Sequence, residues 1–92
     1  MKKTIYYIMT EKENGKHSVK VNGKQLLHDG TVQERNKIWE KSRNRSFIIE
    51  TLGDDAIGYD QIEIAHGKVE TGKWVKVNTE LYDWQGNTIE GA

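Results

Sequence analysis

The sequence predicts an α+β domain dominated by antiparallel strands, in which a curved sheet or small barrel surrounds one helix. Two Asn-Gly pairs, Asn14–Gly15 and Asn22–Gly23, stand eight residues apart and are typical of tight hairpin turns. A capping box formed by Thr31 and Glu34 marks the start of a helix. Apolar and alternating segments typical of strands follow it.

Length and composition narrow the class of protein. The chain has 92 residues, no cysteine and a formal net charge of zero. That length suits one hydrophobic core but not two, so residues 1–92 are expected to form a single domain. The lack of cysteine excludes disulfides, a thiolate nucleophile and Cys-ligated zinc. No apolar run reaches the length of a membrane span or a signal-peptide core. We therefore expect a small soluble domain in the cytoplasm of a bacterial-type cell.

The N-terminal third is predicted to form a meander of two or three antiparallel strands. Residues 4–10 are rich in β-branched and aromatic side chains, which favour a strand. Residues 17–21 alternate in polarity between the two Asn-Gly turns, and residues 24–28 follow the second turn.

A single helix is predicted at about 32–43, after the capping box. Its apolar stripe is thin, since Trp39 is its main large apolar side chain. We expect Trp39 to anchor the helix, with Trp74 as the obvious packing partner, and Asn44 to end it.

The remaining chain is predicted to add three or four strands. Residues 47–52 include apolar side chains at both odd and even positions, which is typical of a central strand covered on both faces. Residues 61–64 alternate with Ile62 and Ile64 inward, and residues 73–82 form the longest strand pattern. A loop at 53–58, a connector between Gly67 and Gly72, and a turn at 83–87 that returns Asn87–Glu90 to the sheet complete the prediction.

The charges divide unevenly between the two halves of the chain. Residues 1–46 carry eleven Lys or Arg against five Asp or Glu, whereas residues 47–92 carry three against nine. The halves therefore have net charges of about +6 and −6. Two interpretations stay open: the halves pack together and neutralise each other, or they present an exposed bipolar surface.

An aromatic row near the C-terminus is a candidate protein-binding surface. If residues 73–84 are one regular strand, the outward face carries Trp74, Lys76, Asn78, Glu80, Tyr82 and Trp84. The candidate binding residues on it are Trp74, Lys76, Tyr82 and Trp84. Val75, Val77 and Leu81 would then face the core. A bulge near Asn78–Thr79 would instead send the later aromatics into the core. This row, with the charge split, predicts a possible homodimer that buries residues 73–84.

A basic row on the predicted helix is a candidate nucleic-acid-binding surface. It consists of Lys37, Lys41 and Arg45, with Arg43 nearby. Such a row can meet phosphates, although Glu34 and Glu40 dilute its charge. The near-neutral pI is well below that of dedicated nucleic-acid binders.

Signatures of enzyme chemistry are weak. The three histidines, His17, His28 and His66, lack metal-ligand spacing, and no phosphate loop or nucleophile motif is present. An acidic cluster (Asp54, Asp55, Asp60 and Glu63) lacks the pattern of a calcium loop. We therefore expect no cofactor, no metal and a non-enzymatic protein-binding domain. The alternatives are a nucleic-acid-binding accessory protein that uses the basic N-terminal half, and a small metal-dependent hydrolase.

Overall fold

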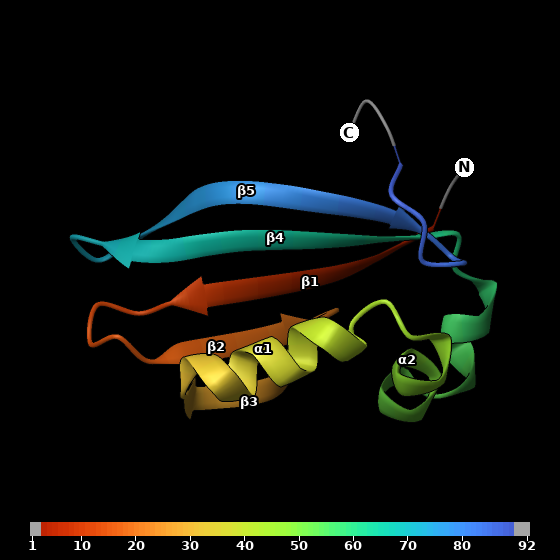
Figure 1. The fold of residues 1–92 in the computed structure, drawn as a ribbon, viewed down its shortest axis with the longest axis horizontal. Helices are drawn as coiled ribbons and strands as arrows, with labels where there is room; N and C mark the ends of the chain where they lie inside the picture. Colours follow the sequence, from red (N-terminus) through yellow and green to blue (C-terminus); the bar gives the residue numbers. More distant parts are fainter. Residues whose placement is uncertain (1–2, 90–92) are drawn as a thin grey trace.

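The computed structural model describes residues 3–89, which form one five-stranded sheet with helices against it (Figure 1). The strands lie in the order β3-β2-β1-β4-β5. In chain order the elements are β1 (Thr4–Glu11), β2 (His17–Val21), β3 (Lys24–Gly30), α1 (Val32–Lys41), α2 (Arg45–Leu52), the 3₁₀ helix η1 (Asp54–Gly58), β4 (Gln61–Glu70) and β5 (Lys73–Asp83).

The sheet is open, and this corrects the prediction of a small barrel. β1 pairs antiparallel with β2 and parallel with β4, and the other two pairings are antiparallel. The α+β class and the mostly antiparallel sheet are thus confirmed. β3 and β5 stand at opposite edges, and a barrel would require them to pair with each other.

The predicted N-terminal meander is confirmed. β1 and β2 are joined through Asn14–Gly15, where Gly15 has a φ of 81°. At the second turn Asn22 and Gly23 both have positive φ, 47° and 84°, as a two-residue hairpin turn of this kind requires.

The structure has a second helix where a central strand was predicted. α1 begins with the expected capping box between Thr31 and Glu34 but ends at Lys41, with Ser42 as its C-terminal cap. Asn44 does not end that helix. Its side-chain oxygen accepts a hydrogen bond from the Phe47 N–H and caps α2. Residues 47–52, apolar on both parities, are therefore helical, so the prediction of one helix is wrong.

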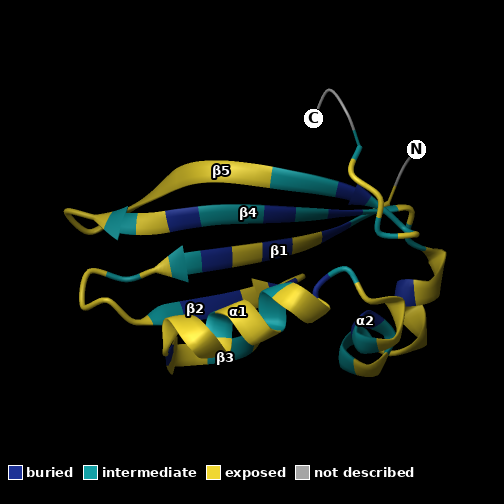
Figure 2. Cartoon of the chain, in the orientation of Figure 1, coloured by how far each residue is buried: buried dark blue, intermediate teal, exposed yellow. Residues whose placement is uncertain are grey.

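α1 lies over β2 and β3, and α2 lies beyond the ends of these strands and adds Ile48 to the core (Figure 2). The buried set consists of Ile5, Tyr7, Met9, Val19, Val21, Ile48, Ala56, Ile62, Ile64 and Tyr82. Trp39 and Ile38 of α1 are half-buried against this core. On the opposite face Tyr6 and Ile8 are exposed, and no helix covers them.

The β4–β5 hairpin is longer than predicted. Ile62 and Ile64 point inward and are fully buried, as expected. The predicted connector between Gly67 and Gly72 is wrong in its first part, because β4 continues to Glu70 and only two residues turn the chain. After β5, Asp83 accepts backbone hydrogen bonds in the next turn, and the chain returns so that Thr88 pairs with Tyr82. The predicted end of that return, Glu90, lies outside the described residues.

A bulge at Val77 determines which side chains of β5 face the helices. Lys76 pairs with Gly67 and Asn78 pairs with His66, so Val77 is the extra residue opposite this step of β4. The inward-outward alternation therefore reverses within β5. Glu80 and Tyr82 face the helices, and Val75 and Val77, which were predicted to face the core, are 39% and 61% exposed.

Among residues 3–89, no helix has the length and apolar character needed to cross a bilayer.

Candidate functional site

The four predicted protein-binding side chains do not share a face. Trp74 and Lys76 precede the bulge, and Trp74 lies across Gly67 on the helix-free face, where its indole N–H donates to the Thr10 hydroxyl at 3.0 Å. Tyr82, after the bulge, is 6% exposed in the core, and Trp84 is half-buried against it. Trp74 therefore does not pack on Trp39, which corrects the expected anchor contact: the two indoles are on opposite faces of the sheet.

The first part of β5 is exposed along its whole length (Figure 2). We call residues 73–79 the open edge, because β5 is an edge strand and no described element pairs with its outer side there. Trp74, Val75 and Val77 are 42%, 39% and 61% exposed. An exposed edge with large apolar side chains is unusual in a monomer and is a template for another strand.

The four predicted nucleic-acid-binding side chains do not form one row. α1 stops at Lys41, and Arg45 starts the separately capped α2. The Arg43 guanidinium stacks between two rings, 5.0 Å from Trp39 and 4.9 Å from Tyr82. The other stacked cations are Arg45, 5.0 Å from the Trp84 ring, and Lys41, 5.9 Å from the Phe47 ring. Among the four candidates, Lys37 alone makes no such contact within the described residues.

Glu80 is the centre of a polar group between the sheet and α1, which we call the Glu80 cluster. One carboxylate oxygen of Glu80 accepts from the Trp39 indole at 2.8 Å and lies 2.6 Å from His66 Nε2. The other accepts from the Tyr82 hydroxyl at 2.7 Å. Three side chains thus satisfy a carboxylate whose side chain is only 24% exposed.

The protonation of the Glu80 cluster follows from this geometry. Burial by itself would raise the pKa of Glu80, but hydrogen bonds from His66, Trp39 and Tyr82 outweigh it and hold the pKa below its ordinary value. The pKa of Tyr82 is raised by burial and by its hydrogen bond to the Glu80 carboxylate. Glu80 is therefore an ionised acceptor at neutral pH, and Tyr82 is a neutral donor.

A carboxylate that orients a histidine is also a part of general-base sites in enzymes. In such sites the imidazole contacts a nucleophile, whereas His66 makes no hydrogen bond to a Ser or Thr hydroxyl within residues 3–89. No group of three or more His, Asp or Glu side chains among the described residues is arranged to hold a metal ion. On this geometry the Glu80 cluster supports α1 on the sheet.

No ion pair within residues 3–89 joins the basic N-terminal half to the acidic C-terminal half. Within residues 3–89, Lys12 pairs with Asp29 in the basic half at 2.5 Å, and Lys68 pairs with Glu70 in the acidic half at 2.9 Å. The two histidine–carboxylate pairs likewise stay within one half each. The halves meet mainly through the backbone pairing of β1 with β4. Both interpretations of the split thus remain predictions.

Sequence reasoning missed the Glu80 cluster and the position of Arg35. Glu80 pairs with Ile64, and His66 follows Ile64 by two residues in β4, so both face the helices only in the register that the bulge sets. On the helical wheel Arg35 falls between the apolar residues of α1, which indicates that it faces the sheet, but that position alone does not show that its charge is unpaired.

A comparison with protein-family models, curated proteins and solved structures finds no match to this chain.

Proposed function

We propose that the chain is a non-enzymatic protein-binding domain that adds an extended segment of a partner protein to the open edge of β5. The observation that carries the proposal is the unbroken exposure of residues 73–79 at the edge of the sheet. The nucleic-acid and hydrolase alternatives have no comparable surface or site among the described residues.

The backbone of the open edge supplies the first part of the binding energy. An edge strand has outward N–H and C=O groups that another strand can pair with. Natural edges are usually protected by a covering element or by a strong kink. Here the bulge at Val77 lies inside the open edge, but β5 pairs with β4 on both sides of it.

The side chains of the open edge indicate the chemistry of the partner. Trp74 faces the helix-free side, and Val75 and Val77 face the helix side, so apolar side chains of the added strand would be contacted on both faces. Lys73 and Lys76 are the charged residues of the open edge, and neither forms an ion pair within the described residues. The partner segment is therefore expected to combine apolar residues with Asp or Glu.

A second copy of this chain is the main competing occupant. The expected homodimer buried residues 73–84, but Tyr82 is already covered within one chain. A dimer through β5 would accordingly use the open edge alone. It would also bring the basic Lys73 and Lys76 of both copies to one interface, which disfavours self-pairing at low salt.

The test compares a variant of the open edge with a control variant at another exposed apolar residue. V75E/V77E places carboxylates on the open edge, and I57E makes the same kind of change at Ile57 of η1, which is 59% exposed. A partner is isolated from the native host with the wild-type chain, purified and bound again to each variant. We expect V75E/V77E to weaken binding at least tenfold and I57E to change it less than twofold, and the partner to protect backbone amides of residues 73–79 from hydrogen exchange.

Three results would contradict the proposal. Equal loss with both variants would show that the interface lies elsewhere, as would protection outside β5. Partner binding that K73E/K76E strengthens would contradict the expected acidic segment. A stable wild-type dimer in sedimentation at tens of micromolar, abolished by V75E/V77E, would identify a second copy as the occupant.

A further inference from the structure

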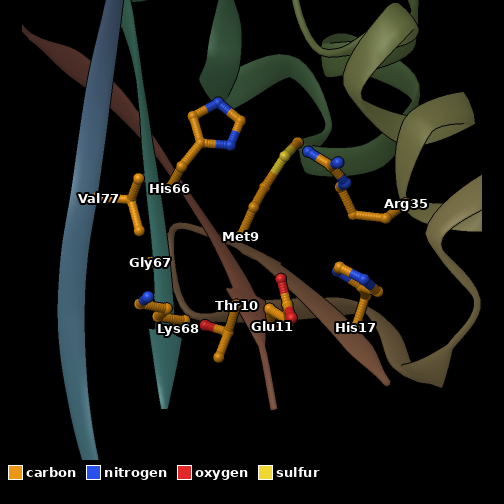
Figure 3. A pocket seen from close by; sticks show the side chains of 9 residues that line it. All are labelled: Met9, Thr10, Glu11, His17, Arg35, His66, Gly67, Lys68 and Val77. Atoms are coloured by element: carbon orange, nitrogen blue, oxygen red, sulfur yellow. The ribbon is translucent and has the colours of Figure 1, made fainter. Parts of the chain in front are cut away.

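A hollow beside the N-terminal part of α1, on the helix side of the sheet, contains an arginine without a partner among residues 3–89. Its wall combines apolar and charged side chains: Met9, Glu11, His17, Arg35, His66, Lys68 and Val77. Figure 3 shows Arg35 reaching from α1 toward Met9, with His66 on one side of the hollow and Glu11 and His17 on the other.

The Arg35 guanidinium is the uncompensated charge of this hollow. Its Nε atom is buried and has no hydrogen-bond partner, and Arg35 forms no ion pair within residues 3–89. A buried donor without an acceptor costs more free energy than the same group in water, and a charged donor costs more than a neutral one. Such a group therefore indicates an acceptor that binds there.

None of the nearby carboxylates of residues 3–89 pairs with Arg35. Glu34, its neighbour in α1, is bound by the backbone N–H and hydroxyl of Thr31 in the capping box. Glu80 already accepts from Trp39, His66 and Tyr82. Glu11 is on the wall of the hollow but forms no hydrogen bond or ion pair with Arg35. The described residues thus leave Arg35 without an acceptor in this structure, and a bound ligand can supply one.

We propose that the hollow binds a carboxylate group, which pairs with Arg35. The planar guanidinium presents two parallel N–H groups that match the two oxygens of a carboxylate. His17, whose ring makes no hydrogen bond within the described residues, is placed to donate a further N–H. Met9 and Val77 supply an apolar wall for the short carbon chain that carries the carboxylate.

The charge balance of the hollow favours a carboxylate over a phosphate. Lys68 already pairs with Glu70 at 2.9 Å, so Arg35 is the main free positive charge, and Glu11 adds a negative one. Glu11 already offsets one positive charge of the hollow, so a singly charged carboxylate meets less repulsion there than a doubly charged phosphate does. Val77 belongs both to the open edge and to this wall, so the test of the hollow uses substitutions outside the open edge.

The carboxylate can belong to a free small acid or to an acidic side chain of a peptide. Sodium acetate and a blocked tripeptide with one central Glu serve as the two probes, each titrated at constant ionic strength and followed by NMR of the Arg35 Nε–H. We expect saturable shifts at Arg35 and His17. Tighter binding of acetate identifies a free acid as the ligand, and tighter binding of the peptide identifies an acidic side chain; both support the site.

Two variants separate this site from general surface charge. R35Q removes the guanidinium, and K37Q removes one positive charge from the exposed part of the same helix. We expect R35Q to weaken binding of the better probe about tenfold or more and K37Q to change it less than twofold.

Three outcomes would overturn the proposal: no saturable shift with either probe, equal weakening by both variants, or tighter binding of inorganic phosphate than of acetate. The amide spectrum of R35Q shows directly whether this variant is folded. If it is not, Arg35→Lys is titrated instead. Wild-type affinity in Arg35→Lys would contradict a carboxylate that pairs with two N–H groups of the guanidinium.

Discussion

The two ends of β5 differ more than any other two parts of one element in this molecule. Residues 80–83 lie against the helices, with Tyr82 in the core and Glu80 bound by three side chains. Residues 73–79 lie at the open edge with both faces exposed. Yet both ends carry aromatic and apolar side chains, so composition does not explain the difference.

The difference arises from contact with the helices and from side-chain orientation. We call residues 80–83 the covered end. α1 supplies Trp39 to the covered end, and the bulge at Val77 turns Tyr82 and Glu80 toward this helix. The open edge extends past the helices, as Figure 1 shows for the part of β5 next to the turn to β4. The comparison teaches that one strand can separate two tasks: its covered end stabilises the fold, and its open edge remains free for a partner. Substitutions at the two ends should accordingly change different measurements.

Tyr82→Ala should have the largest effect on stability. It removes a 6% exposed ring from the core and a donor from Glu80. We expect a loss of about 3–5 kcal/mol in the free energy of unfolding, measured by urea denaturation. The matched change at the open edge, Val75→Ala, should cost less than about 0.5 kcal/mol, since Val75 is already exposed. Equal losses of unfolding free energy in the two variants would show that the two ends of β5 contribute equally to stability.

Glu80→Gln should have the next largest effect, because a neutral amide cannot accept from three donors as a carboxylate does. We expect a loss of about 1–3 kcal/mol at pH 7. Gln has a size similar to that of Glu, so the loss reports the charge and the hydrogen bonds. A variant as stable as the wild type at pH 7 would mean that the carboxylate contributes little.

The pH dependence of that loss follows from the lowered pKa of Glu80, which burial opposes and its three hydrogen bonds outweigh. A carboxyl with a lower pKa in the folded state than in the unfolded chain stabilises the fold above the unfolded value, about 4.3 for Glu. This contribution disappears as the pH falls through the folded pKa. The difference between wild type and Glu80→Gln should thus shrink as the pH falls below about 4.3. A difference that stays constant below that pH would contradict the assigned pKa direction.

The contact of Trp74 with Gly67 tests how firmly the open edge is held. A Cβ at Gly67 would overlap the Trp74 indole, which must then move and lose its bond to Thr10. We expect Gly67→Ala to cost about 1–2 kcal/mol and to change tryptophan fluorescence. In the Trp74→Ala background the same change should cost clearly less, and Gly58→Ala, which has open space, is the control. Additive effects would show that the two residues do not interact.

The N-terminal half was predictable because its signals are local. Each Asn-Gly pair carries the positive φ that its turn needs, and Thr31 and Glu34 satisfy each other within four residues. The central segment was not predictable in this way, because a short apolar run fits a buried strand and a helix equally well. The deciding signal was Asn44, whose side chain caps α2, but an Asn after a helix is also typical of a helix end.

The faces on which the aromatic side chains of β5 lie depend on a one-residue shift in the pairing of β5 with β4. A regular strand from Lys73 to Trp84 would have placed Trp74 and Tyr82 together, and the bulge at Val77 separates them. That bulge belongs to the pairing of β4 with β5, which no local pattern specifies. Sequence reasoning located the strand and its exposed first aromatic side chain. It did not find the group around Glu80, since its members are brought together only by packing of α1 on the sheet.

Arg43→Gln should have a smaller effect at the covered end. The Arg43 guanidinium lies about midway between Trp39 and Tyr82, 5.0 and 4.9 Å from the two rings. We expect a loss of about 0.5–1 kcal/mol, which is typical of an exposed cation–π contact. Lys37→Gln, on the exposed side of α1, should change stability by less than about 0.5 kcal/mol. Equal effects would mean that the stacking of Arg43 does not stabilise the covered end.

Nucleic-acid binding should show the smallest effect of all. Arg43 and Arg45 stack on rings near the covered end, and Lys37 and Lys41 remain on a helix that also carries Glu34 and Glu40. Because few cations are free to neutralise phosphates, we expect a short DNA duplex to bind more weakly than about 1 μM at physiological salt. Replacing Lys37, Lys41 and Arg45 with Gln should then change binding less than about twofold in fluorescence anisotropy. Nanomolar binding whose salt slope falls by about two to three units in that triple variant would mean that the basic side chains beside the covered end, rather than the open edge, carry the function.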